Sequence, residues 1–485
     1  MVATKPLPAI LPEEAILSPD RLSRLENFGR SITSAAYLHR PSRVEQIYDL
    51  FESARARGFT IGLRGAARSY GDASINSGGV VLDLQRLNRI LDWDPVQGVI
   101  RVEPGVTIRQ IWQYTLEDGW WPPVVPGTMA PTIGGCLGMN IHGKNNFAAG
   151  PIGEHVLAFT ALLPSGEEIR CTPEEESELF YAMIGGLGIL GVFTSVTLQL
   201  KRVYSGDLWV EAWNPSGLES MLEDIENRKG EADYLVGWID STARGASLGR
   251  GQIHRADYLA PGEDPQPAVT LGLAHQTLPE NIFGLIPKSV IWRLMRPFFN
   301  RPGLKAVNTA RYLSSRILHN QTRVRQSFAA FNFLLDYVPN WEKAYGSGGL
   351  IQFQIFIPRE KAHDVFSETL RRTQKNGEPT YLGVLKRHRP DRFLLSHAVD
   401  GFSLAMDFRI TKNNVKKIQA QADTLTELAL EAGGRFYFAK DCTLNSETAE
   451  RFLGPDTLRR FRALKERCDP GDLLETDLYR RCFPR

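Results

Sequence analysis

The stretch from Val125 to Val156 constrains the fold most, because it carries seven glycines around one His-Gly-Lys triplet, His142-Gly143-Lys144. Glycine has no Cβ, so its backbone can approach a ligand closely and direct N–H groups at anionic or carbonyl oxygens. An ordinary surface loop would be shorter and more polar between its glycines. We therefore interpret this stretch as one wall of a large cofactor site.

A second glycine-rich turn lies upstream, at Leu63 to Asp72 (LRGAARSYGD). It follows the apolar run Phe59-Thr60-Ile61, and residues 78–84 after it read as a strand. A strand–turn–strand unit of this kind suits a diphosphate held by successive backbone N–H groups.

A third cluster, Gly185 to Gly191, ends in a match to G-x-G-x-x-G. The dinucleotide fingerprint needs a strand before this motif and a helix after it. Here residues 174–184 predict a helix and residues 192–198 a strand, which is the reverse order. The pattern therefore argues against a Rossmann domain.

Composition and charge exclude several classes of protein. A length of 485 residues predicts two or more domains, and a formal charge of +2 gives no nucleic-acid signature. The five cysteines form no C-x-x-C pair, which predicts reduced thiols in the cytoplasm, no disulfide framework and no metal site. Proline and glutamate interrupt the N-terminus where a signal peptide needs an apolar run, and no apolar run reaches the roughly 18 residues of a membrane span.

Local patterns predict several elements. Residues 1–40 read as irregular, and Ser42 with Glu45 forms a capping-box pattern before a helix with apolar Ile47 and Phe51. Thr107 is expected to cap a helix that ends near Leu116. Strands are predicted at 234–239 and 350–357, and a helix at 414–432.

The pattern divides the chain into three parts. Residues 1–204 are predicted to bind the cofactor, 205–430 to form an α+β substrate domain, and 431–485 to return to the first domain. Within the second part, residues 281–335, called the lid segment from here, carry nine basic and no acidic residues among many apolar ones. This composition fits a membrane-surface lid better than a nucleic-acid arm or a solvated loop.

The three glycine clusters, in this order, resemble the FAD-binding domain of the vanillyl-alcohol oxidase / p-cresol methylhydroxylase family. The resemblance rests on Arg64-Gly65 to Asp72, on Pro126-Gly127 to Gly135, and on Gly185 to Val192. It implies an α+β fold with a two-subdomain FAD-binding domain and a substrate domain built on an antiparallel sheet. It also implies an FAD-dependent oxidoreductase acting on CH–OH groups.

Within this family the chain resembles the decaprenylphosphoryl-β-D-ribose 2'-oxidase family. The matching residues are Arg68 to Asp72, Ile141 to Asn145, Leu385-Lys386 and Tyr437 to Asp441. The resemblance implies oxidation of a ribose 2'-hydroxyl on a polyprenyl phosphate, as half of an epimerisation to arabinose in cell-wall biosynthesis. The implied partners are a lipid-linked sugar phosphate, a membrane surface on the cytoplasmic side and an NAD-dependent short-chain reductase, with no nucleic acid. Ala405 stands where the mycobacterial enzymes have an active-site cysteine.

The resemblance also implies roles for individual residues. Catalytic roles fall on Lys440, His142, Tyr437 and Tyr70. FAD-binding roles fall on Arg64, Gly65, Ala66, Ala67, Arg68, Ser69, Tyr70, Gly127, Thr128, Gly134, Gly135, Gly138, Asn140, His142, Gly143, Gly191, Val192 and Lys440. Substrate-binding roles fall on His142, Lys144, Gln352, Gln354 and Lys386.

Other functions stay open at this point. The chain could oxidise a soluble sugar alcohol or lactone, reduce a sterol double bond, or bind FAD without turnover. The C-terminal His-Trp-Gly-Lys-like motif of the aldonolactone and alditol oxidases is absent.

We predict that FAD binds without a covalent link, because Arg68 stands where many members of the family carry the linking histidine. Acid precipitation should leave all the flavin in the supernatant, as measured by absorbance. Yellow colour retained in the washed pellet would contradict this prediction.

Overall fold

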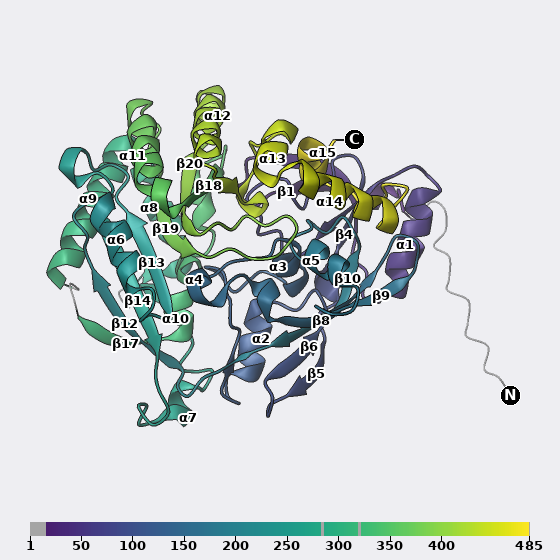
Figure 1. Cartoon of the computed structure of the whole chain (residues 1–485), viewed down its shortest axis with the longest axis horizontal. Helices are drawn as coiled ribbons and strands as arrows, with labels where there is room; N and C mark the ends of the chain where they lie inside the picture. The colour runs from purple at the N-terminus through teal and green to yellow at the C-terminus, as the bar shows by residue number, and fades with distance from the viewer. Residues whose placement is uncertain (1–15, 283–285, 319–321, 485) are drawn as a thin grey trace.

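A computed structural model describes residues 16–282, 286–318 and 322–484 (Figure 1). The described residues do not include 1–15, on which the signal-peptide prediction rests. They also do not include Phe283 and Leu285 of the lid segment.

The first region contains a four-stranded sheet in the order β1-β2-β4-β3, with β3 and β2 parallel to β4. Its elements are β1 (Leu22–Glu26), β2 (Thr33–His39), α1 (Glu45–Arg55), β3 (Ile61–Arg64) and β4 (Val80–Asp83). Helix α1 buries Ile47, Leu50 and Phe51 in the core beneath this sheet.

Two local predictions for this region are wrong. Residues 22–39 form the β1–β2 hairpin, whose half-buried alternation is too weak to stand out in the sequence. Ser42 does not cap α1, since its backbone N–H donates to Gln46 Oε1 at 2.8 Å and Val44 occupies the N-cap position.

A five-stranded sheet in the order β5-β6-β10-β8-β9 completes the first region. Its strands are β5 (Ile90–Asp94), β6 (Val99–Val102), β8 (Val156–Leu162), β9 (Glu168–Cys171) and β10 (Val192–Gln199). The helices with it are α2 (Ile108–Thr115), α3 (Ile133–Gly138), α4 (Asn146–Ala149) and α5 (Ser177–Met183), and β7 (Trp120–Trp121) pairs with β11 (Lys201–Arg202). Thr107 and Gln110 form a capping box, which confirms the predicted start of α2. The third glycine cluster lies between α5 and β10, which confirms the helix-before-strand order.

The second region is built on an eight-stranded sheet in which all described neighbours are antiparallel, in the order β17-β12-β14-β13-β19-β20-β18-β21. Its strands are β12 (Asp207–Trp213), β13 (Tyr234–Ile239), β14 (Gly251–Tyr258), β17 (Arg323–Ser327), β18 (Leu350–Pro358), β19 (Gly383–His388), β20 (Gly401–Arg409) and β21 (Arg435–Phe436). Its main helices are α6 (Leu218–Arg228), α11 (Arg359–Lys375) and α12 (Val415–Glu431), with short helices α7 (Pro267–Thr270) and α10 (Phe328–Asn332). The predicted α+β fold class is confirmed.

The lid segment contains the hairpin β15 (Asn281–Ile282) and β16 (Ile286–Pro287), then α8 (Ile291–Met295) and α9 (Arg301–Leu318). Its last part is not a lid, because β17 and α10 follow and β17 pairs with β12 at the edge of the large sheet. None of the helices in the described part of the chain is both long enough and apolar enough to cross a bilayer.

The C-terminal helices α13 (Ser446–Leu453), α14 (Pro455–Cys468) and α15 (Asp477–Cys482) lie beside the first region (Figure 1). The Ile61 N–H donates to Leu473 O at 2.7 Å, and the Arg481 guanidinium binds Asp72 and Asp441 at 2.7 and 2.9 Å. Strand β21 pairs with β18, so the residues after Glu431 contact both regions.

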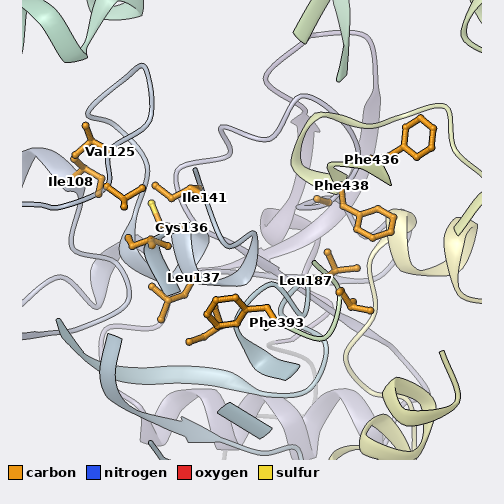
Figure 2. Packing of buried hydrophobic residues seen from close by; sticks show 14 of the residues in the cluster. Ile108, Val125, Cys136, Leu137, Ile141, Leu187, Phe393, Phe436 and Phe438 are labelled. Carbon is orange, nitrogen blue, oxygen red and sulfur yellow. The ribbon is translucent and has the colours of Figure 1, made fainter. Parts of the chain in front are cut away.

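One apolar core joins the two regions. Figure 2 shows Leu137, Ile141 and Leu187 of the glycine-rich segments in the same cluster as Phe393 and Phe436 from the second half of the chain. Because dense packing transmits shifts, these glycine-rich segments are fixed relative to the large sheet.

Candidate active site

The glycine-rich segments enclose a cavity, called the cofactor cavity from here. Its wall includes most of the predicted FAD-binding and catalytic residues, namely Arg64, Gly65, Ala66, Ala67, Arg68, Ser69, Tyr70, Gly127, Thr128, Gly134, Gly135, Gly138, His142, Tyr437 and Lys440. Residues that are far apart in the chain therefore meet at one site.

The first glycine turn offers a row of free donors. No described residue accepts a hydrogen bond from the backbone N–H groups of Ala66, Ala67, Arg68 or Ser69. Ala67 adopts φ +53°, which turns the chain into a concave loop. A Cβ at Gly65 would collide with Thr132 Oγ1, so only glycine fits there. These groups fit a diphosphate.

The second glycine segment leaves room for a flat ligand. A Cβ at Gly134 would lie 2.8 Å from Pro104 Cβ, so α3 packs against this loop without a side chain between them. A Cβ at Gly138 would meet no atom closer than 3.8 Å and would occupy open space. The free N–H groups and this space together fit FAD.

Four predicted FAD-binding residues are not in the described wall of this cavity. The Asn140 side chain accepts the Gly153 N–H at 3.0 Å, and Gly143 packs on Asn145 and the Val125 carbonyl. Gly191 packs on Met183, and Val192 is fully buried opposite Leu162 in the sheet. These residues shape the segments that carry the wall.

A second cavity, called the substrate cavity from here, lies between the large sheet and the lid segment. Its volume is about 710 Å³. Tyr70, Gly127, Leu335, Lys386 and Lys440 line both cavities, so the two meet at these side chains. Of the predicted substrate residues, Lys144, Gln352, Gln354 and Lys386 line the substrate cavity. The fifth, His142, is in the described lining of the cofactor cavity and not in that of the substrate cavity.

Strand register explains this convergence. Gln352 lies opposite Asp407 and Gln354 opposite Ala405 across β18 and β20. Paired residues project from the same face of a sheet, and alternate residues share that face. The register therefore places Gln352, Gln354 and Ala405 together under the substrate cavity.

Three buried lysines dominate the electrostatics. Burial lowers the pKa of Lys144 to about 7 and that of Lys440 to about 8, although Asp407 opposes the second shift. The pKa of Lys386 lies well below its usual value because of burial and the positive charges of Lys440 and Lys144. Lys144 Nζ donates to the carbonyls of Phe331 and Asn332, whereas the ammonium groups of Lys386 and Lys440 form no hydrogen bond or salt bridge with a described residue.

Asp407 is a buried acid that the sequence reasoning did not select. Its carboxylate accepts hydrogen bonds from Tyr345 Oη at 3.1 Å and from Gln352 Nε2, and burial raises its pKa to about 6. Because the carboxylate accepts from the amide nitrogen, Gln352 Oε1 is left without a partner among the described residues. The available signal was a single acid in an otherwise apolar strand, Leu404 to Phe408.

His142 lies in a cluster of buried rings with His388 and Tyr437, whose ring centroids are 4.9 and 5.2 Å away. Its Nε2 lies 3.3 Å from Gln354 Nε2, and an amide nitrogen can only donate, so the ring proton is assigned to Nδ1. That Nδ1 has no partner among the described residues. Burial and Lys386 hold the pKa of His142 well below its usual value, so the ring is neutral and free to donate to a ligand.

The sequence comparisons agree with this geometry. Residues 35–172 match the family model described as FAD binding domain. The chain is 28% identical over 479 residues to the decaprenylphosphoryl-β-D-ribose oxidase of Mycolicibacterium smegmatis, covering 96% of this chain and 98% of that protein. It is 32% identical over 148 residues to a D-lactate dehydrogenase of Anaerostipes hadrus, covering 30% of each protein. It is 26% identical over 225 residues to the D-arabinono-1,4-lactone oxidase of Yarrowia lipolytica, covering 46% of this chain and 42% of that protein.

We predict that Lys440→Ala abolishes flavin reduction by substrate while FAD stays bound. The free N–H groups of the first glycine turn do not depend on this side chain, whereas a cation facing both cavities stabilises negative charge that develops during reduction. The measurement is the single-turnover reduction rate at full flavin occupancy, with the exposed Lys416→Ala as control. A rate within about tenfold of the parent, roughly 1.4 kcal/mol, would exclude Lys440 from catalysis.

Proposed function

We propose that this chain, an FAD-dependent oxidoreductase, oxidises the 2'-hydroxyl of a polyprenylphosphoryl-β-D-ribose to a ketone, as half of an epimerisation to the arabinose form. The relative from M. smegmatis is named for decaprenylphosphoryl-β-D-ribose and aligns over nearly the whole chain.

The charge of the substrate cavity carries this proposal. Its described lining includes Lys144, Arg311, Lys386 and Lys440, and no aspartate or glutamate. Arg311, an exposed residue, lies 4.2 Å from the ring centroid of Trp238. Buried cations without counter-charges are costly, so an anionic ligand is favoured. A sugar phosphate meets this requirement, whereas a sterol or a neutral sugar alcohol does not.

The apolar part of the same cavity supports a lipid tail. Met295, Phe298, Leu304 and Val307 of the lid segment line it, opposite Val236 of β13. The cavity volume of about 710 Å³ lies in the upper half of the range of about 300–1,000 Å³ that small-molecule sites span. A soluble sugar would leave these side chains in contact with water.

FAD, when bound, accepts the hydride that leaves the sugar carbon. Gln352 Oε1 and His142 Nδ1–H are unpartnered groups that can hold sugar hydroxyls. Lys386 can pair with the substrate phosphate, and Lys440 supplies positive charge where both cavities meet. Ala405 offers no thiol in this cavity, so reagents aimed at a cysteine there have no target.

The proposal implies partners. The ketone would pass to an NAD-dependent short-chain reductase that completes the epimerisation. The lipid-linked substrate places the enzyme peripherally on the cytoplasmic face of a membrane.

Anaerobic titration of the flavin absorbance tests the proposal. A polyprenylphosphoryl pentose should bleach the flavin, and the same pentose without its phosphate should bleach it far more slowly. Bleaching by soluble sugar alcohols or lactones at an equal rate would instead favour a sugar or lactone oxidase. A flavin that no reductant class bleaches would indicate a binding protein without turnover.

We predict that the lid segment holds the enzyme on anionic bilayers. Leu294, Leu313 and Ile317 are 54%, 49% and 80% exposed and would insert their side chains among the lipids. Replacing all three with serine should lower co-sedimentation with liposomes and slow turnover of the lipid-linked substrate, but not of a short-chain soluble analogue. Apolar insertion is not screened by salt, so the difference should persist at high ionic strength.

The matched control replaces exposed apolar residues elsewhere, Val96, Leu157 and Val415, with serine. This variant should bind liposomes like the parent. If the lid variant turned over both substrates equally more slowly than the parent, the segment would belong to the catalytic fold and not to a membrane surface.

A further inference from the structure

A separate hollow, called the basic pocket from here, is lined by residues of α9, of α11 and the turn after it, and of the loop between β13 and β14. Its volume is about 530 Å³, and it is lined by Arg244, Arg250, Arg301 and Lys305, with the hydroxyls of Ser247 and Thr309. No aspartate or glutamate is among its described lining residues. The sequence predictions place no site here.

Two of its cations are already positioned by the protein. Arg250 donates to Asp240 from Nε at 3.0 Å, approaches it with Nη2 at 2.9 Å, and stacks on Tyr312 at 4.4 Å. The Arg301 guanidinium packs against Gly377, where φ is +65° and a side chain would collide with it, and lies 3.8 Å from Glu378. Positioned guanidinium groups lose little entropy when they bind an oxyanion.

The other two cations have no partner. Within the described ranges, the side chains of Arg244 and Lys305 form no salt bridge and donate no hydrogen bond. Four positive groups therefore face two nearby carboxylates, those of Asp240 and Glu378, and the pocket keeps an excess of positive charge.

The wall of the pocket is itself ordered. Gln374 Nε2 of α11 donates to the carbonyls of Ser241 and Ala243 at 2.8 and 2.9 Å, which fixes the loop between β13 and β14 against α11. The basic pocket is thus a built concavity between three elements and not a row of solvated side chains on one helix.

Helix α9 belongs to both sites. Arg301, Lys305 and Thr309 recur every fourth residue and line the basic pocket, while Leu304, Asn308 and Arg311 lie on the neighbouring face and line the substrate cavity. A ligand held between α9, α11 and the β13–β14 loop would fix the helix that forms one wall of the substrate cavity.

We propose that the basic pocket binds a phosphate group, supplied by an anionic lipid headgroup or by free phosphate, and that this binding fixes α9 in place. Guanidinium forks with neighbouring hydroxyls match the oxygens of a phosphate better than a single carboxylate. The inference does not depend on the proposed substrate, because it concerns a different cavity.

The test uses the FAD-loaded protein without substrate. Inorganic phosphate should raise the melting temperature saturably, beyond chloride at equal ionic strength. Arg244→Gln/Lys305→Gln should raise the half-saturating phosphate concentration at least about tenfold, because it removes two charged donors from the pocket. Arg462→Gln/Lys361→Gln removes the same charge from exposed positions outside both the pocket and the lid segment and should behave like the parent.

Vesicles separate the two sources of phosphate. If the ligand is a headgroup, phosphatidic acid in the vesicles should tighten binding of the parent and the control variant relative to pure phosphatidylcholine, and this gain should be lost in the pocket variant. Pure phosphatidylcholine should bind all three equally. If the ligand is free phosphate, only the thermal shift should differ between the variants. Equal phosphate responses in the pocket and control variants, or none beyond chloride, would overturn the proposal. Should the double variant not fold, the single exposed substitutions Arg244→Gln and Lys305→Gln decide by the same measurement.

Discussion

A shortage of negative charge around buried lysines governs the site. Lys144, Lys386 and Lys440 lie along one continuous pair of cavities, and Asp407 is the acid that acts on Lys440. Burial penalises each ammonium, so the pKa values of all three fall. An anionic ligand offsets this penalty, because it lies beside the ammonium groups. Binding of a phosphate or of an electron-rich flavin therefore favours protonation of the lysines, and protonated lysines in turn favour binding of that ligand. The apolar wall of the lid segment strengthens the effect by excluding water.

The large antiparallel sheet positions these charges. Strands β18, β19 and β20 are adjacent, and their register places Gln352, Lys386 and Asp407 on a common surface under the substrate cavity. The carboxylate of Asp407 fixes the amide of Gln352 so that its oxygen is free, and Tyr345 holds the same carboxylate. A rigid sheet holds such groups more precisely than loops can. The lid segment, in contrast, contributes shape and apolar surface.

The sequence predicted elements best where local chemistry is strong. The capping pair Thr107 and Gln110, the apolar strand at 350–357 and the helix beginning after Asn414 all appear in the structure near their expected bounds. The hairpin of β1 and β2 was missed because few of its residues are fully buried. The prediction that Ser42 and Glu45 form a capping box is wrong, because the side chain that accepts from the Ser42 N–H is Gln46, one residue later than expected.

By itself, the sequence determined the three glycine-rich segments and the order of helix and strand around the third one. It also determined the arginine at position 68 and the absence of acidic residues in the lid segment. Each of these features depends only on residues that are neighbours in the chain. Tertiary structure alone decided that Gly65 must pack on Thr132, that Asp407 must hold Gln352, and that α9 must separate a substrate cavity from a basic pocket. These contacts join residues tens to hundreds of positions apart. They depend on strand register and on close packing between elements, which no local pattern encodes.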